Sequence, residues 1–234
     1  MKEKILRNLE WLVGFILVVC VIYGSYNLSK KVAGENVQKK ETDVVLDAGH
    51  GGDDPGKVGV NGAKEKEINL AVVQKIQKIL EEEGISVILT RTKDARLDKN
   101  GQEYSKTEDM KTRVQVMNEA KPKLVVSVHQ NSYPSEDVKG GQVFYFTHSA
   151  ESQKYAEIMQ EAIRTVDPSN HRQMKENETY YLLKKTEVPA LIVECGFLSN
   201  WEEAEKLIQD SYQEEMAKAI AEGIKSCLES TSQN

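Results

Sequence analysis

Two histidines lie where short apolar runs give way to polar residues. His50 stands in the segment DAGHGG, between glycines that let the backbone turn sharply and leave the imidazole uncovered. His129 follows the run KLVVSV, and Glu65 lies between the two histidines in the segment KEKEINL. Two histidines and one carboxylate are a common ligand set for catalytic zinc, which keeps a fourth position open for water. These residue types indicate a hydrolytic metal site.

A further carboxylate at such a site would move protons. Glu194 ends the apolar run ALIVE, residues 190–194, and stands where a strand is expected to end. A carboxylate in that place can accept a proton from water activated by the metal. Glu194 is therefore the candidate general base.

From these residues alone, other interpretations stay open. His148 also follows an apolar run and competes as a metal ligand, whereas His171 lies in a polar loop and is expected to be exposed to solvent. The histidines could be hydrogen-bonded structural residues, Glu65 could simply stabilise a helix N-terminus, and Glu194 could be a buried structural carboxylate. Residue spacing does not decide among these readings.

An α/β fold is expected to position these side chains. From residue 42 onward, β-branched runs alternate with amphipathic stretches, and several of the runs are apolar throughout, as in strands that are covered on both faces. We predict a mostly parallel or mixed central sheet with helices on both faces and the zinc site at the carboxyl ends of the strands. The predicted strands are residues 44–49, 85–91, 123–129, 141–147 and 190–196.

Helical periodicity fills the gaps between these strands. Apolar spacing predicts a helix from about Ile68 to Gly84, a second that ends near Pro122, a third over residues 155–166, and one or two more near the C-terminus. The polar segments 92–110 and 167–180 show no clear periodicity. We expect them to be loops over the active face.

Charge and cysteine content exclude several classes of protein. The chain has 31 Lys plus Arg against 37 Asp plus Glu, a net charge of −6, so it lacks the basic field that holds a nucleic acid. Three cysteines, Cys20, Cys195 and Cys227, are an odd number at unrelated spacings and do not form a disulfide framework. We expect Cys195 and Cys227 to be buried thiols.

The N-terminus carries an apolar segment. Residues 11–24 contain no charge and follow Lys2, Lys4 and Arg7. These 14 residues are short of the roughly 20 that span a bilayer, but apolar neighbours could lengthen them. The absence of a clean small-residue cleavage pattern favours an uncleaved anchor over a signal peptide. We predict a membrane anchor or signal segment over residues 1–28, a polar linker over 29–41, a catalytic domain over 42–230 and a polar tail over 231–234.

Four ordered blocks resemble a known family. DAGHGGDDPG, EKEINL, SVHQNS and VPALIVECGFLSN are similar to the signature blocks of the zinc-dependent N-acetylmuramoyl-L-alanine amidases of bacterial cell walls, over about residues 43–225. The resemblance implies Zn²⁺ as cofactor, with His50, Glu65 and His129 as ligands. Within EKEINL it selects Glu65 and not Glu67, and it implies that Glu194 is the catalytic residue.

Other positions follow or depart from the family pattern. Arg91 and Arg113 stand where the pattern has arginine, which implies a supporting or substrate-orienting part. Ala48 replaces a usual proline, Gln130 a usual alanine, and Cys195 a residue that is often small or apolar. None of these departures removes a ligand, although Gln130 could alter substrate fit.

The resemblance also implies a substrate and a compartment. The expected reaction is hydrolysis of the amide between the lactyl group of N-acetylmuramic acid and L-alanine in peptidoglycan, outside the cytoplasm, by a membrane-anchored or secreted protein. One catalytic domain behind an N-terminal membrane segment looks most like the germination-specific amidases of spore formers. These enzymes remove stem peptides from spore cortex ahead of muramic δ-lactam formation, and their compartment would be the forespore intermembrane space.

We consider two alternative functions. The first is a cysteine amidase that uses Cys195 with a nearby histidine. The second is an inactive or partner-dependent zinc-bound module that binds the wall or activates another enzyme, and an unidentified helper protein is left open as a partner. The presence of Glu194 favours an enzyme, because an inactive relative would most easily lose its catalytic carboxylate.

Overall fold

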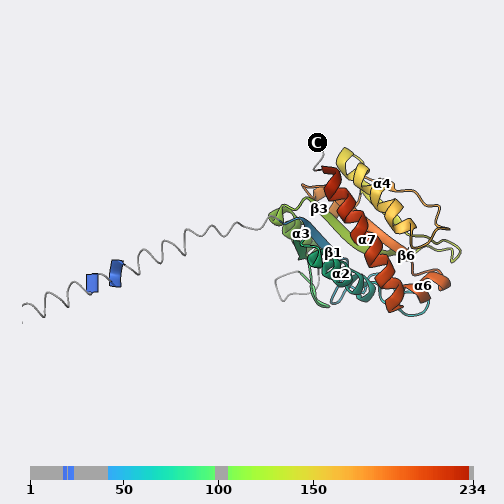
Figure 1. Ribbon diagram of the computed structural model, residues 1–234. Helices are drawn as coiled ribbons and strands as arrows, with labels where there is room; N and C mark the ends of the chain where they lie inside the picture. Colours follow the sequence, from blue (N-terminus) through green and yellow to red (C-terminus); the bar gives the residue numbers. More distant parts are fainter. Residues whose placement is uncertain (1–17, 20, 24–41, 98–104, 232–234) are drawn as a thin grey trace, which may run out of the picture. The chain divides into compact units, whose positions relative to one another are not determined.

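Short β-branched runs build a six-stranded central sheet (Figure 1). The computed structural model describes residues 18, 19, 21–23, 42–97 and 105–231. The strand order is β2-β1-β3-β6-β4-β5, and neighbouring strands are parallel except β4, which runs antiparallel to β6. The strands are β1 (Val44–Ala48), β2 (Val87–Leu89), β3 (Leu124–Asn131), β4 (Gln142–Phe146), β5 (Lys175–Asn177) and β6 (Ala190–Phe197). The predicted mixed α/β sheet is confirmed.

Helices cover both faces of this sheet because successive strand residues point to opposite sides. Leu46 and Val126 enter a core with α2, α4 and α7, and Figure 1 shows α7 between α2 and α4. Val45 and Val125 point the other way and pack with residues of α3 and α5. The helices are α2 (Glu65–Glu82), α3 (Lys106–Ala120), α4 (Ala150–Arg164), α5 (Tyr181–Lys185), α6 (Trp201–Leu207) and α7 (Asp210–Thr231).

Two segments expected to be loops contain regular structure. Helix α3 begins at Lys106, inside segment 92–110, where the Ser105 hydroxyl caps the helix by accepting the N–H of Glu108. Strand β5 lies inside segment 167–180 and pairs in parallel with β4. The loop expectation was wrong there because the first turn of α3 is polar and β5 lacks alternating apolar residues.

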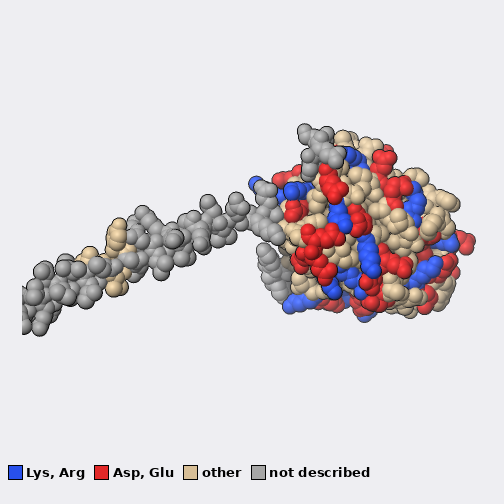
Figure 2. All heavy atoms as spheres, viewed as in Figure 1, with Lys and Arg blue, Asp and Glu red and all other residues tan. Residues whose placement is uncertain are grey.

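Acidic and basic side chains are intermingled on the face of the molecule shown in Figure 2. Some of these charges pair between elements. Lys75 of α2 lies 2.6 Å from Asp210 of α7, and Lys225 of α7 lies 3.0 Å from Glu83. Exposed pairs of this kind contribute about 0–1 kcal/mol each, so the apolar core holds α7 in place.

The chain divides by its internal contacts into two units, Met1–Lys40 and Glu41–Asn234. In the first unit, the described residues 18, 19 and 21–23 are helical and exposed. Among the residues that the structure describes, no helix has both the length and the apolar character needed to cross a membrane. Most of the predicted anchor, the predicted linker and most of the C-terminal tail lie outside the described residues, so those boundaries stay predictions.

Candidate metal centre

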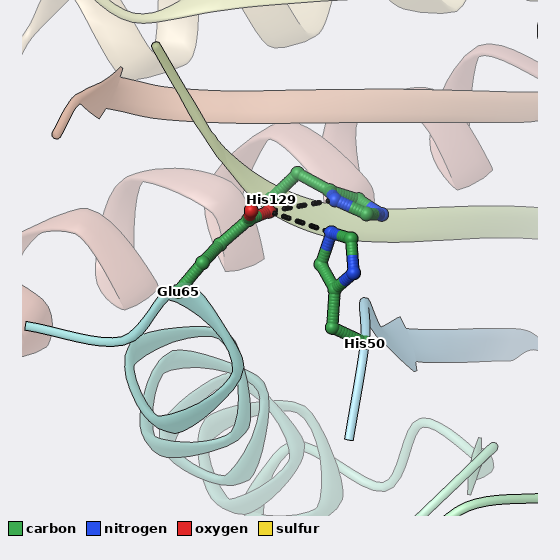
Figure 3. Close-up of side chains that lie close together, drawn as sticks. All are labelled: His50, Glu65 and His129. Atoms are coloured by element: carbon green, nitrogen blue, oxygen red, sulfur yellow. Dashed lines mark hydrogen bonds and ion pairs between the residues drawn. The ribbon is translucent and has the colours of Figure 1, made fainter. Parts of the chain in front are cut away.

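His50, Glu65 and His129 come together at the carboxyl ends of β1 and β3 (Figure 3). His50 lies two residues after the end of β1, Glu65 is the first residue of α2, and His129 lies in β3. The Oε1 atom of Glu65 lies 3.2 Å from His50 Nε2 and 2.9 Å from His129 Nδ1. One ligand atom from each residue lies within 4.8 Å of the others, a spacing that allows a single metal ion to bind all three.

The loop before α2 holds Glu65 in place. No side chain caps α2, and the N–H groups of Glu65 and Lys66 instead donate to the carbonyls of Lys57 and Pro55. In return, the Lys57 N–H donates to Glu65 Oε2 at 2.7 Å. Gly56 has a φ of 69°, and a Cβ on it would lie 2.5 Å from Glu65 Oε2. The loop can therefore approach the carboxylate this closely only because residue 56 is glycine.

His50 adopts a left-handed backbone conformation that aims its ring at Glu65. Its φ is 63°, which is uncommon for a residue other than glycine. Its Nδ1 lies 2.8 Å from Asp54 Oδ2. Because an ionised carboxylate can only accept, this contact keeps a proton on Nδ1, so Nε2, which faces Glu65, is the nitrogen that a metal would bind.

Arg91 and Arg113 clamp the backbone of this turn. Arg91 donates to the carbonyls of Ala48 at 2.9 Å and Gly49 at 3.1 Å. Arg113 donates to the carbonyls of Ala48 at 2.8 Å and His50 at 2.6 Å. The two guanidinium groups thus satisfy three successive carbonyls where the strand ends. The supporting part that the family pattern implies for these arginines takes this physical form.

The buried charge of Arg113 is balanced by two aspartates. Its guanidinium lies 2.7 Å from both Asp47 and Asp109. Burial alone would raise the pKa of Asp47, but the Arg113 charge and hydrogen bonds from the Ser127 and Thr90 hydroxyls lower it to about 2. Sequence reasoning missed both aspartates, although an Asp inside the apolar run VVLDAG was a visible signal.

Gln130 contacts Glu65 of the candidate metal site. The β3–β6 register shifts between His129 and Asn131, and the Gln130 N–H donates to Glu65 Oε1 at 3.1 Å. Its side-chain amide donates to Asn69 Oδ1 at 3.2 Å and is only 2% exposed. The buried side chain braces Asn69, so an effect on substrate fit would have to pass through the position of Glu65.

Neighbouring histidines keep Glu65 ionised. Burial would raise the pKa of Glu65, but hydrogen bonds and charges from His129 and His50 hold it far below its usual value. Burial would lower the pKa of His129, but its hydrogen bond to Glu65 raises it. Ionised Glu65 favours a bound cation, and a metal ion that binds His129 would displace the proton that the raised pKa of this imidazole retains.

Glu194 stands beside this cluster on the neighbouring strand. It pairs in register with His129, and its buried Oε2 has no hydrogen-bond partner among the described residues. Burial, with a contribution from the charge of Glu65, raises the pKa of Glu194 to about 7. The carboxylate, His50 and His129 line one pocket of about 230 Å³. Glu194 is therefore placed to exchange protons with a molecule bound there.

The other polar candidates lie elsewhere. Because β4 runs antiparallel to β6, His148 follows β4 at the opposite edge of the sheet, where it is exposed and packs against Phe146. His171 is exposed, as expected. Cys195 is buried, and burial raises its thiol pKa to about 12 despite a hydrogen bond with Gln130. A thiol with that pKa is a poor nucleophile at neutral pH.

These residues fit a zinc ion. Two imidazoles and one carboxylate are typical zinc donors, and the Asp54 contact orients one of the imidazoles. Gly49 supplies space, since a Cβ on it would lie 2.3 Å from the His129 ring. The buried Oε2 of Glu194, which lacks a described partner, supplies an acceptor beside the cluster.

Known proteins resemble this chain over most of its length. Residues 44–226 match the family model described as N-acetylmuramoyl-L-alanine amidase. The chain is 34% identical over 227 residues to the germination-specific N-acetylmuramoyl-L-alanine amidase of Bacillus subtilis. The match covers 96% of this chain and 95% of that protein.

Solved structures agree as well. The CwlD amidase of Clostridioides difficile, solved in complex with the GerS lipoprotein, matches with a TM-score of 0.78 and 35% identity over 81% of this chain and 99% of that one. The catalytic domain of CwlV from Bacillus (Paenibacillus) polymyxa matches with a TM-score of 0.72 and 31% identity over 80% of this chain and 98% of that one. The family match spans most of the chain and contains all four candidate site residues. The chain therefore belongs to the N-acetylmuramoyl-L-alanine amidase family.

Proposed function

We propose that this protein is a zinc-dependent amidase that hydrolyses the bond between the lactyl group of N-acetylmuramic acid and the L-alanine of the peptidoglycan stem peptide. One observation carries the proposal: in a member of this family, a cluster of two histidines and a glutamate shares a pocket with a second, buried glutamate. His50, Glu65 and His129 would hold the metal. Bound zinc supplies a Lewis acid that polarises the scissile carbonyl and lowers the pKa of water from 15.7 to roughly 7.

Glu194 would carry the proton. In its ionised form it accepts a proton from the attacking water, and it then donates that proton to the alanine nitrogen so that a neutral amine leaves. Burial raises the pKa of Glu194, which favours the protonated form that donates in the second step, whereas a bound cation would favour the ionised form that accepts in the first. The two histidines and Glu65 keep their positions throughout, held by Asp54, the Arg91–Arg113 clamp and the loop before α2.

We further propose that the substrate is spore cortex and that removal of its stem peptides precedes muramic δ-lactam formation. Similarity to the germination-specific amidase supports this assignment. Peptidoglycan lies outside the cytoplasmic membrane, so the domain would act there, held by an N-terminal anchor or released from it. The CwlD amidase was solved with the lipoprotein GerS, which supports a helper protein as a second partner for this chain.

The rival functions have weaker support. A cysteine amidase would need a reactive thiol, and Cys195 is buried with a raised pKa. A zinc-bound wall-binding module would have no use for a buried carboxylate next to the cluster, since leaving Glu194 Oε2 without a partner costs stability.

Mass spectrometry of digested walls tests the proposal. The full-length chain, purified in detergent with Zn²⁺, is incubated separately with vegetative wall and with spore cortex, and the soluble products are analysed. We expect free stem peptides that begin at L-alanine, more of them from cortex, and none from the Glu194→Gln variant. Equal release from both walls would overturn the cortex assignment. Absence of release by zinc-loaded protein would favour a required helper protein or the wall-binding module.

A further inference from the structure

The pocket at the metal centre has a second wall that the proposed reaction does not use. One side carries His50, His129 and Glu194, and the other side is built from the first turn of α3 and the start of α5. The pocket measures about 230 Å³. Its lining residues are His50, Lys106, Met110, His129, Tyr180, Tyr181, Leu182, Ile192 and Glu194.

The tyrosine part of this wall is held in place by local contacts. The Tyr180 ring packs against Phe144 of β4 with 5.6 Å between ring centroids. Asn177 Oδ1 accepts the N–H groups of Thr179 and Tyr180, which fixes the turn that leads into α5. The wall therefore exists before a ligand arrives, which lowers the entropic cost of binding.

Lys106 is the only cationic side chain of lysine or arginine type among the residues that line this pocket. It is the first residue of α3, where a positive charge opposes the helix dipole and does not help the helix. Within the described part of the chain its side chain is exposed and forms no ion pair. A lysine placed there at a local cost is suited to bind an anion in the pocket.

The size of the pocket limits what it can hold. Its volume is below the roughly 300–1,000 Å³ of sites that enclose drug-sized ligands. A pocket of this size holds a short segment of a ligand and leaves the rest outside. Because Lys106 and Glu194 line the same pocket, an anion bound at Lys106 would belong to a residue near the scissile amide.

We propose that this wall binds the peptide side of the substrate and that the Lys106 ammonium group binds a carboxylate on the second residue of the stem peptide. The inference rests on the proposed amidase function and adds a substrate preference to it. Stem peptides with a free carboxylate at the second residue bind better than those in which that group is a carboxamide. Tyr180, Tyr181 and Leu182 contact the apolar parts of the same segment.

Two glycan preparations test the preference. Their stem peptides differ only at the second residue, which carries a carboxylate in one and a carboxamide in the other. The full-length zinc-loaded chain is compared with Lys106→Gln, with Lys106→Arg, and with Lys78→Gln, which removes an exposed charge on α2. KM and kcat are measured for each protein on each of the two preparations. Affinity for the released peptides is measured by calorimetry in a Glu194→Gln background.

We expect Lys106→Gln to raise KM about 3- to 10-fold for the carboxylate substrate only, with kcat little changed. Lys106→Arg should keep the preference, Lys78→Gln should leave it intact, and added salt should weaken it in the parent chain. Equal losses on both substrates, or no loss on either, would overturn the proposal. If the parent chain cleaves neither preparation, the amidase function fails, and the calorimetric comparison still reports whether Lys106 distinguishes the two peptides.

Discussion

His129 and Glu194 pair in register on the neighbouring parallel strands β3 and β6. Register partners point to the same face of a sheet and stand about 4.8 Å apart, so the two side chains enter one pocket from adjacent strands. Their tasks are nevertheless separable. His129 belongs to the cluster around Glu65, whereas the buried Oε2 of Glu194 has no hydrogen-bond partner among the described residues.

Replacing these partners should therefore affect different properties. Glu194→Gln should bind one zinc ion per chain and lose about 10²–10⁴-fold in turnover, because only proton transfer is removed. His129→Ala should lose both zinc and turnover, because a ligand is missing. Metal analysis after dialysis, together with stem-peptide release, measures the two properties. Similar zinc loss in the two variants would contradict the assigned roles.

Asp54 should control zinc affinity without touching the metal. In Asp54→Asn the amide no longer forces the His50 proton onto Nδ1, so affinity should fall about 10- to 100-fold. Competition with a chelator measures the change. Asp53→Asn is the matched control, since Asp53 is exposed and pairs with Arg96. An unchanged affinity in Asp54→Asn would show that this contact does not set the ring's tautomer.

A comparison of alanine substitutions at Gly56 and Gly62 distinguishes backbone strain from damage to the metal site. Both have positive φ, 69° and 81°, so alanine at either should cost about 1–2 kcal/mol of stability. A Cβ at Gly56 would also lie 2.5 Å from Glu65 Oε2, whereas one at Gly62 meets nothing within 4 Å. Zinc affinity should fall at least about tenfold only in Gly56→Ala. Denaturant unfolding and zinc titration distinguish the effects, and equal affinity in the two variants would be the contrary result.

Glu194 should make the metal-free protein less stable as pH rises. Its pKa is about 7 in the folded chain against 4.5 for the ordinary side chain, so the folded state holds more protons between these values. The stability that the protonated group provides is complete below pH 4.5 and is lost as pH rises through about 7, a change of about 3 kcal/mol.

Denaturant unfolding with a metal chelator present measures this change. The free energy of unfolding of the parent chain minus that of Glu194→Gln should fall across pH 4.5–7, because the glutamine side chain of the variant cannot ionise and all other groups cancel. A difference that stays constant with pH would show that Glu194 does not titrate in this range. Added zinc should reduce the slope, since a cation favours the ionised carboxylate.

Local patterns in the sequence were enough for the α/β class and for the polar residues that end the strands. Apolar runs predict buried strands, and the end of each run places His50, His129 and Glu194 near one edge if the strands are parallel. The structure brings these three residues together with Glu65. The polar first turn of α3 and the short strand β5 escaped prediction because neither has the periodicity on which such predictions depend.

Strand direction and helix placement were decided by tertiary structure. His148 follows an apolar run just as His129 does, but the antiparallel course of β4 carries it to the other edge of the sheet. The contact of Arg113 with His50 and the pocket wall that contains Lys106 likewise depend on how α3 packs against β1 and α5. Periodicity records which face of an element is buried. The direction of a strand and the partners of a helix follow from contacts between residues far apart in the chain, so only the folded structure reveals them.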